Sequence, residues 1–243
     1  MNKFLKPFYY LYQAVFAMPV FFLITVYTAF FTLFTTKWKN SDFVHRTQQF
    51  WAKSYLKLAF LPVTVEGTEK LDMKQSYVFV SNHQSTTDVF LIYGWLPSVF
   101  KWIMKQELRK VPFIGFGCAA AGHIFIERQN KRHALESIGN AEQVLHDGVC
   151  VVVFPEGTRS TNGQVGRFKR GAFHIAQELQ LPIVPISLSG CYETVPKGKL
   201  FVRWHPVKMY IGDPIDSTKY PKEQMDELIA LTREKVIEHI EKL

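Results

Sequence analysis

The sequence predicts an α/β fold in which a mixed, open β-sheet is flanked by helices and preceded by an N-terminal membrane anchor of two helices. Three features of the 243 residues favour it: an uncharged N-terminal stretch, an amphipathic stretch after it, and short β-rich runs that then alternate with helical segments. The length suits one large domain with a small appendage. We therefore expect membrane-anchoring helices over residues 1–60 and an α/β domain over residues 61–243.

The N-terminal stretch carries no charged side chain over residues 7–36 and has two lysines on either side. A single helix of this length would measure about 45 Å, longer than the roughly 30 Å hydrocarbon core of a bilayer. Pro19 removes a backbone donor and predicts a kink, and the headgroup region suits Tyr9, Tyr10 and Tyr12. We expect this helix to attach the protein to a lipid bilayer. Its orientation stays open, and a cleaved signal peptide is the alternative.

The segment from Ser41 to Phe60 places large apolar residues at helical intervals among His, Arg, Gln and Lys. This pattern predicts an amphipathic helix. The pattern leaves two positions open for it: it completes a two-helix anchor that dips into one leaflet, or it packs on the α/β domain.

The α/β domain is predicted from β-rich runs that begin after Leu61. The runs are VTVEG (63–67), YVFVS (77–81), HIFIE (123–127), VCVVVF (149–154) and IVPISL (183–188). Helices are expected at 130–146, 168–179 and 223–243, and one or two further strands within 199–211. Polar residues follow the ends of these strands, where open α/β sheets usually bind ligands.

Composition narrows the classes of partner. The chain has 29 Lys and Arg against 21 Asp and Glu, a net charge of +8 that suits anionic partners such as phosphorylated substrates and lipid headgroups. The basic clusters resemble no nucleic-acid module, so we expect no nucleic-acid partner. The three cysteines, Cys118, Cys150 and Cys191, are widely spaced and form no zinc-ligand pattern with the histidines, so we expect no metal site.

The segment Asn82-His83-Gln84-Ser85-Thr86-Thr87-Asp88 directly follows an apolar strand. If the chain turns between His83 and Asp88, the carboxylate can accept the Nδ1 proton and leave Nε2 free as a base for a substrate hydroxyl. Ser85-x-x-Asp88 is also a capping box for the apolar helix 89–96, which gives Asp88 a structural alternative. The two roles are compatible.

The segment Phe154-Pro155-Glu156-Gly157-Thr158-Arg159-Ser160 follows the most apolar strand. Gly157 lets backbone N–H groups approach an anion, Thr158 adds a hydroxyl, and Arg159 offers a two-pronged contact to a phosphate. The alternative is a surface turn with a Glu–Arg pair.

Taken in order, four segments resemble the signature blocks of the glycerolipid acyltransferase family. Asn82-His83-x-Ser85-x-x-Asp88 is similar to the first block and Phe154–Ser160 to the third, and residues 124–128 and 181–186 are similar to the second and fourth. The resemblance runs over about residues 60–215 and implies a fold like that of the glycerol-3-phosphate acyltransferases. The residues of the first and third blocks are most similar to those of lysophosphatidic acid acyltransferases.

The resemblance implies roles for individual residues. His83 would be the general base and Asp88 would orient it. The glycerol phosphate of the acceptor would be bound by Glu156, Gly157, Thr158 and Arg159, together with Arg128 of the second block. Lys105 is a further candidate by position and charge.

The implied reaction moves a fatty acyl chain from acyl-CoA or acyl carrier protein to the sn-2 hydroxyl of lysophosphatidic acid, forming phosphatidic acid. It involves no covalent acyl-enzyme and no bound cofactor, and either donor is a co-substrate. Because the acceptor and product stay in the membrane, we expect a membrane-associated enzyme whose active site faces the cytoplasm.

Three alternatives remain open. The same chemistry could act on glycerol 3-phosphate or another lysophospholipid. A non-catalytic membrane protein could use the basic pocket to bind anionic lipid. A hydrolase could use Ser85 or Cys118 as nucleophile, although the sequence has no G-x-S-x-G elbow.

Overall fold

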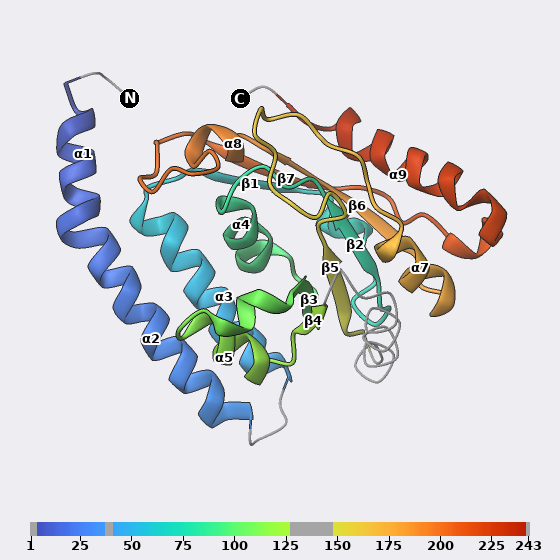
Figure 1. The fold of residues 1–243 in the computed structure, drawn as a ribbon, viewed down its shortest axis with the longest axis horizontal. Coiled ribbons are helices and arrows are strands. Elements are labelled where there is room, and N and C mark those ends of the chain that lie inside the picture. Colours follow the sequence, from blue (N-terminus) through green and yellow to red (C-terminus); the bar gives the residue numbers. More distant parts are fainter. Residues whose placement is uncertain (1–3, 37–40, 127–147, 242–243) are drawn as a thin grey trace.

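A computed structural model describes residues 4–36, 41–126 and 148–241 (Figure 1). The N-terminal stretch forms one continuous helix from α1 (Lys6–Tyr12) through a π-helical turn η1 (Gln13–Ala17) to α2 (Met18–Thr35). In the π-helical turn the N–H of Met18 donates to the carbonyl of Gln13, just before Pro19, which has no N–H to donate. The structure thus has a π-helical turn just before Pro19, where the sequence predicts a kink.

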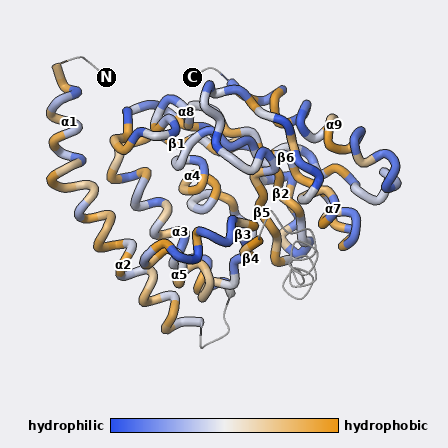
Figure 2. Tube along the Cα trace, viewed as in Figure 1, coloured by the Kyte–Doolittle hydropathy of each residue, from blue (hydrophilic) through white to orange (hydrophobic). Residues whose placement is uncertain are grey.

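The helix Lys6–Thr35 is long and apolar enough to cross a membrane by length and composition, and only 17% of its most apolar 18-residue stretch is buried. Figure 2 shows hydrophobic residues along most of α2. Phe8, Val15 and Leu23 are each more than 60% exposed. An exposed apolar surface of this extent on a helix is typical of a site that binds a partner, for example a membrane.

The amphipathic helix α3 (Ser41–Leu58) lies between α2 and α4 (Thr87–Trp95) (Figure 1). Ala52 and Leu56 are fully buried in the core under α4, and Trp51 Nε1 donates to Thr25 Oγ1 of α2 at 2.9 Å. One face of α3 therefore packs on the α/β domain, and Trp51 also joins α3 to α2, so the predicted two-helix anchor is supported only in part. Phe50, on the other side, is 56% exposed.

Within the described residues, seven strands form one sheet in the order β1-β7-β6-β2-β5-β3-β4. Only the β6–β7 pair is antiparallel, so the predicted mixed sheet is confirmed. The strands are β1 (Val63–Glu66), β2 (Val78–Ser81), β3 (Phe100–Lys105), β4 (Ile124–Ile126), β5 (Cys150–Val153), β6 (Ile183–Ser189) and β7 (Val207–Ile211). The central strands β2, β5 and β6 are buried along their whole length, which explains their continuous apolar sequences.

Helices cover both faces of the sheet. Phe79 and Val152 point to the face covered by α3 and α4, while Val78 and Val151 point to the face covered by α7 (Gly171–Glu178) and α9 (Met225–Glu238) (Figure 1). The shorter elements are η3 (Thr68–Lys70), η4 (Gln106–Lys110), α5 (Ile114–Ala120), α8 (Cys191–Thr194), η5 (Ser217–Lys219) and η6 (Lys222–Gln224).

Some sequence predictions hold, others missed an element, and one stays untested. One strand, β7, lies within residues 199–211, as expected, and residues 199–206 form no strand. The strand β3 and the helix α5 were not expected. The helix predicted at 130–146 lies outside the described residues.

Candidate active site

The candidate site lies where two parallel neighbours, β2 and β5, end. Val80 of β2 pairs with Val153 of β5, so the loops that follow, residues 82–86 and 154–170, leave the same edge of the sheet. The N–H of Ser160 donates to the carbonyl of His83 at 2.8 Å and joins the two loops. The two segments, about seventy residues apart in the sequence, therefore lie against each other.

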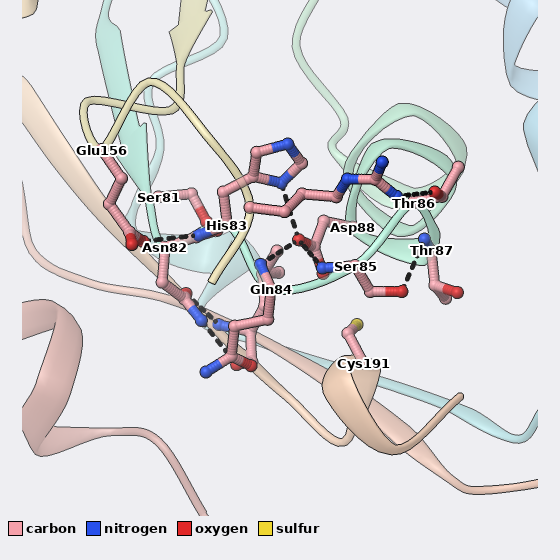
Figure 3. Close-up of polar contacts among 12 residues, drawn as sticks. Ser81, Asn82, His83, Gln84, Ser85, Thr86, Thr87, Asp88, Glu156 and Cys191 are labelled. Carbon is pink, nitrogen blue, oxygen red and sulfur yellow. Dashed lines mark hydrogen bonds and ion pairs between the residues drawn. The ribbon is translucent and has the colours of Figure 1, made fainter. Parts of the chain in front are cut away.

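His83 and Asp88 are paired. His83 Nδ1 lies 2.8 Å from Asp88 Oδ2. Figure 3 marks this interaction with a dashed line. The Asp88 side chain is fully buried, whereas the His83 side chain is 16% exposed. The imidazole stacks on Phe154 with ring centroids 3.9 Å apart and an angle of 9° between the planes. Nε2 has no hydrogen-bond partner in the part of the chain that the structure describes, which leaves it available to a substrate proton.

Asp88 also organises the turn that makes this pair possible. The same oxygen, Oδ2, accepts the backbone N–H groups of Gln84 at 2.6 Å and Ser85 at 2.8 Å. Ser85 Oγ accepts the N–H of Thr87 at the start of α4. Asp88 thus holds the His83 ring and stabilises the beginning of the helix, so the catalytic and capping interpretations of its sequence position are both compatible with the geometry.

The first loop, residues 82–86, is also held by β6 and by the segment that follows β6. Asn82 exchanges two hydrogen bonds with the backbone of Leu188, at 3.0 and 2.9 Å. The thiol of Cys191 lies beside Asp88 (Figure 3). Complete burial, followed by the nearby negative charge of Asp88, raises the pKa of Cys191 well above its ordinary value, so this thiol stays neutral.

Glu156 connects the loops through its carboxylate. Oε1 accepts the N–H of His83 at 2.8 Å, and Oε2 accepts the N–H of Gly166 at 2.9 Å. Burial raises the pKa of Glu156 from its ordinary value, although the two N–H donors act in the opposite direction. Both oxygens are therefore engaged inside the protein.

Gly157, Thr158 and Arg159 lie at or near the surface of the second loop. Gly157 has φ +76°, a left-handed conformation that glycine adopts without strain. Thr158 is exposed, and Arg159 Nη1 donates to Thr86 Oγ1 at 2.6 Å. A hydroxyl and a guanidinium thus lie at the surface beside the His83 and Asp88 pair, in an arrangement suited to an anionic ligand.

Comparison with known proteins decides the family. The model of the family described as Acyltransferase matches residues 62–189. The chain belongs to the acyltransferase family. The resemblance seen in the sequence is therefore confirmed at the level of the family.

Several acyltransferases resemble the chain over most of its length. The 1-acyl-sn-glycerol-3-phosphate acyltransferase of Cocos nucifera is 33% identical over 180 residues, 74% of this chain and 58% of that protein. The alpha form from Homo sapiens is 44% identical over 128 residues, 52% of this chain and 45% of that one. The chain thus spans about three fifths or less of the length of these curated relatives.

A solved structure resembles the whole chain. The crystal structure of the 1-acyl-sn-glycerophosphate (LPA) acyltransferase PlsC from Thermotoga maritima has a TM-score of 0.79 and 27% sequence identity, and the similarity covers 100% of both chains. The mixed α/β architecture is thus shared with an acyltransferase.

Two further predicted phosphate ligands of this acyltransferase, Lys105 and Arg128, do not belong to the two loops in sequence. Lys105 is exposed at the end of β3, which runs parallel to β5 and ends at the same edge of the sheet. No acidic side chain pairs with it among residues 4–36, 41–126 and 148–241. Arg128 lies outside the described residues, two positions after β4 ends at Ile126.

The hydrolase alternative has no support in the geometry. Ser85 Oγ is buried and donates to the carbonyl of Val195 at 3.0 Å, so its proton is not directed at a base. Burial raises the pKa of Cys118 to about 12, which keeps this thiol protonated near neutral pH.

The described residues also contain no group of three or more His, Cys, Asp and Glu side chains that could hold a metal ion.

The sequence did not indicate the roles of Phe154 and Gly166. Phe154 was expected as the end of a strand, and it supports the His83 ring instead. The stacking of Phe154 on His83 joins residues far apart in the chain, and no local sequence pattern predicts such a contact. The Gly166 contact stays within the second loop, because Glu156 lies only ten residues before it.

Proposed function

We propose that this acyltransferase moves a fatty acyl chain from a soluble thioester donor to the sn-2 hydroxyl of lysophosphatidic acid and so forms phosphatidic acid. The observation that carries the proposal is the His83 and Asp88 pair, 2.8 Å apart, beside the exposed Thr158 and the half-buried Arg159. The names of the relatives from Cocos nucifera, Homo sapiens and Thermotoga maritima support the choice of acceptor.

In the proposed reaction, Nε2 of His83 takes the proton of the sn-2 hydroxyl while the hydroxyl oxygen attacks the thioester carbonyl. A new C–O bond forms, and the carbonyl oxygen becomes an oxyanion. When the tetrahedral intermediate collapses, the C–S bond breaks and the departing thiolate receives the proton from the imidazolium. The substrate hydroxyl is itself the nucleophile, so no acyl-enzyme is formed.

Asp88 serves this cycle in two ways. Its hydrogen bond to Nδ1 fixes the tautomer that exposes a basic Nε2, and its buried charge stabilises the imidazolium that forms. We propose that a backbone N–H group stabilises the oxyanion, because this charge needs a preorganised donor.

The acceptor phosphate would lie against the outward face of the second loop. Arg159 and Thr158 supply charged and neutral donors, and Gly157 allows close approach of the backbone. Lys105 and Arg128 would add positive charge. Glu156 carries the wrong charge to contact a phosphate, and we propose that it supports the site by holding the backbones of His83 and Gly166 in place.

The exposed apolar surface of the helix Lys6–Thr35 supports attachment to a lipid bilayer. Such attachment would bring the site to an acceptor that stays in the membrane, while acyl-CoA or acyl carrier protein arrives from the cytoplasm. The chemistry requires no bound cofactor.

The test is acyl transfer by the purified protein in lipid vesicles, with labelled acyl-CoA or acyl carrier protein as donor. Lysophosphatidic acid, glycerol 3-phosphate and lysophosphatidylcholine are offered as acceptors. We expect phosphatidic acid from the first acceptor, and His83→Ala should lower turnover by about two to four orders of magnitude. His174→Ala, an exposed histidine on α7, is the matched control and should keep wild-type turnover.

Other outcomes identify the alternatives. Transfer to another acceptor would keep the mechanism and change the substrate. Absence of transfer with every donor and acceptor, together with lipid binding that persists in His83→Ala, would favour a non-catalytic lipid-binding protein.

A further inference from the structure

A cation that belongs to none of the four signature segments reaches the candidate phosphate site. Lys197 Nζ lies 3.4 Å from Thr158 Oγ1, and both side chains are exposed. Lys197 is far from the second loop in sequence and approaches it from the segment that follows α8. No acidic side chain forms an ion pair with Lys197 in the described part of the chain.

We propose that Lys197 is a further ligand of the acceptor phosphate and that it favours acceptors carrying a phosphate monoester. This inference rests on the proposed function and extends it to a residue outside the family signature. Thr158 would then present its hydroxyl between two cations, Arg159 from the same loop and Lys197 from the segment opposite.

The backbone that carries Lys197 is fixed on both sides. Before it, the carbonyl of Val195 accepts a hydrogen bond from Ser85 Oγ at 3.0 Å, and Thr194 Oγ1 lies 2.8 Å from Thr87 Oγ1. After it, Val202 exchanges two hydrogen bonds of 2.8 Å with the side chain of Gln13 in the π-helical turn. Lys197 therefore projects from an anchored segment, which reduces the conformational entropy lost when it binds a ligand.

Charge explains why this lysine would select among acceptors. A phosphate monoester carries about two negative charges near neutral pH, whereas a phosphodiester carries one. Arg159 Nη1 already donates to Thr86, so the guanidinium is held beside the site and leaves its other N–H groups for a phosphate. Lys197, the second cation, lies on the other side of Thr158 and balances the second negative charge of the monoester. A diester lacks this second charge, so Lys197 contributes less to its binding.

Binding is measured in the His83→Ala background, where turnover does not consume the ligand. Soluble short-chain lysophosphatidic acid and lysophosphatidylglycerol of the same chain length are titrated calorimetrically into detergent-solubilised protein. Lys197→Ala should weaken binding of the monoester by about tenfold, the size expected for one charge-assisted hydrogen bond at a partly solvated site. Binding of the diester should weaken by less.

Lys199→Ala is the matched control, because Lys199 is exposed on the same segment and its side chain forms no hydrogen bond or ion pair among the described residues. Its affinity for both ligands should equal that of the parent protein. Lys197→Arg, which keeps the charge, should retain the preference for the monoester.

Equal weakening of both ligands, or no weakening in Lys197→Ala, would overturn the proposal. The same is true if the parent protein binds neither ligand. A failure of the proposed function is seen separately, as absence of acyl transfer by the wild-type protein, and the binding comparison still decides the role of Lys197.

Discussion

The carboxylate of Glu156 accepts the backbone N–H of His83 at 2.8 Å and so connects the loop after β5 to the loop after β2. Its second oxygen accepts the N–H of Gly166 at 2.9 Å. A carboxylate suits this position because it accepts at both oxygens, whereas an amide can accept at one only. The Glu156 carboxylate therefore holds the His83 backbone in place from the neighbouring loop.

Glu156→Gln should disturb this connection without changing the size of the side chain. Its amide NH₂ would face one of the two backbone donors, so one part-buried N–H would lose its acceptor, at a cost of about 1 kcal/mol in unfolding free energy. We also expect a lower kcat, because the His83 backbone is less constrained. Denaturant unfolding and acyl-transfer kinetics measure the two effects.

Glu178→Gln is the control for this substitution, since Glu178 is exposed on α7. It should change neither quantity appreciably. A Glu156→Gln protein with wild-type stability and kcat would show that the connection between the loops is dispensable.

Asp88→Asn should lower kcat by about two to four orders of magnitude, because the amide favours the wrong tautomer of His83 and cannot stabilise the imidazolium by charge. Binding of lysophosphatidic acid should change much less, since Asp88 is buried behind His83. Steady-state kinetics and calorimetric binding separate the two. Asp213→Asn, whose side chain is 83% exposed, is the control and should leave kcat unchanged. Comparable losses in binding and in kcat would indicate that the substitution disrupts the loop rather than the chemistry.

The pairing of His83 with Asp88 could be predicted because the information is local. Both residues lie in one seven-residue segment after a strand, and the turn that joins them is closed by N–H groups of Gln84 and Ser85 from the same segment. The continuous apolar sequences of β2, β5 and β6 likewise predicted buried strands.

Features that depend on distant residues could not be predicted. Lysines interrupt the apolar pattern of β3, yet Lys101 is accommodated because Nζ donates to the carbonyl of Ala121 at 2.7 Å. Lys197 and Lys199 look alike in sequence, and only the fold brings one of them to Thr158. The hydrogen bond of Gln13, a polar residue within an apolar helix, could not be predicted either, because its partner Val202 is distant in the sequence.

Gln13→Leu should destabilise the protein although it keeps the volume of the side chain. Gln13 is 2% exposed and satisfies both the N–H and the carbonyl of the buried Val202. Without the amide, two buried backbone groups lose their partners, at a total of about 2–4 kcal/mol. Because the pair also fixes the segment that carries Lys197, we expect a higher KM for lysophosphatidic acid.

Unfolding in detergent and acceptor titrations measure these effects of Gln13→Leu. The control is Gln224→Ala, an exposed glutamine before α9, which should change the unfolding free energy by no more than about 0.5 kcal/mol. Unchanged stability in Gln13→Leu would mean that water replaces the amide at Val202.

His45→Phe should reduce the pH dependence of stability. His45 on α3 is 5% exposed, lies against Phe100 with ring centroids 5.2 Å apart, and has no hydrogen-bond partner at either nitrogen among the described residues. Burial, and then the positive charge of Lys101, lowers the pKa of His45 to about 4 from an ordinary 6.5. Below pH 6.5 the unfolded chain therefore takes up a proton that the folded chain does not, and stability falls as the pH is lowered towards 4.

For His45 alone this linkage amounts to about 2 kcal/mol between pH 7 and pH 5, from about 1.4 kcal/mol per pH unit within the window. Phenylalanine fills the same space and does not titrate, so His45→Phe should lose less stability than wild type over this range. A residual slope remains, because burial lowers the pKa of His123 to about 3 in the same direction. Denaturant unfolding at the two pH values provides the measurement, with the exposed His174→Phe as the control that keeps the wild-type slope. Parallel losses in wild type and His45→Phe would show that His45 is protonated in the folded protein.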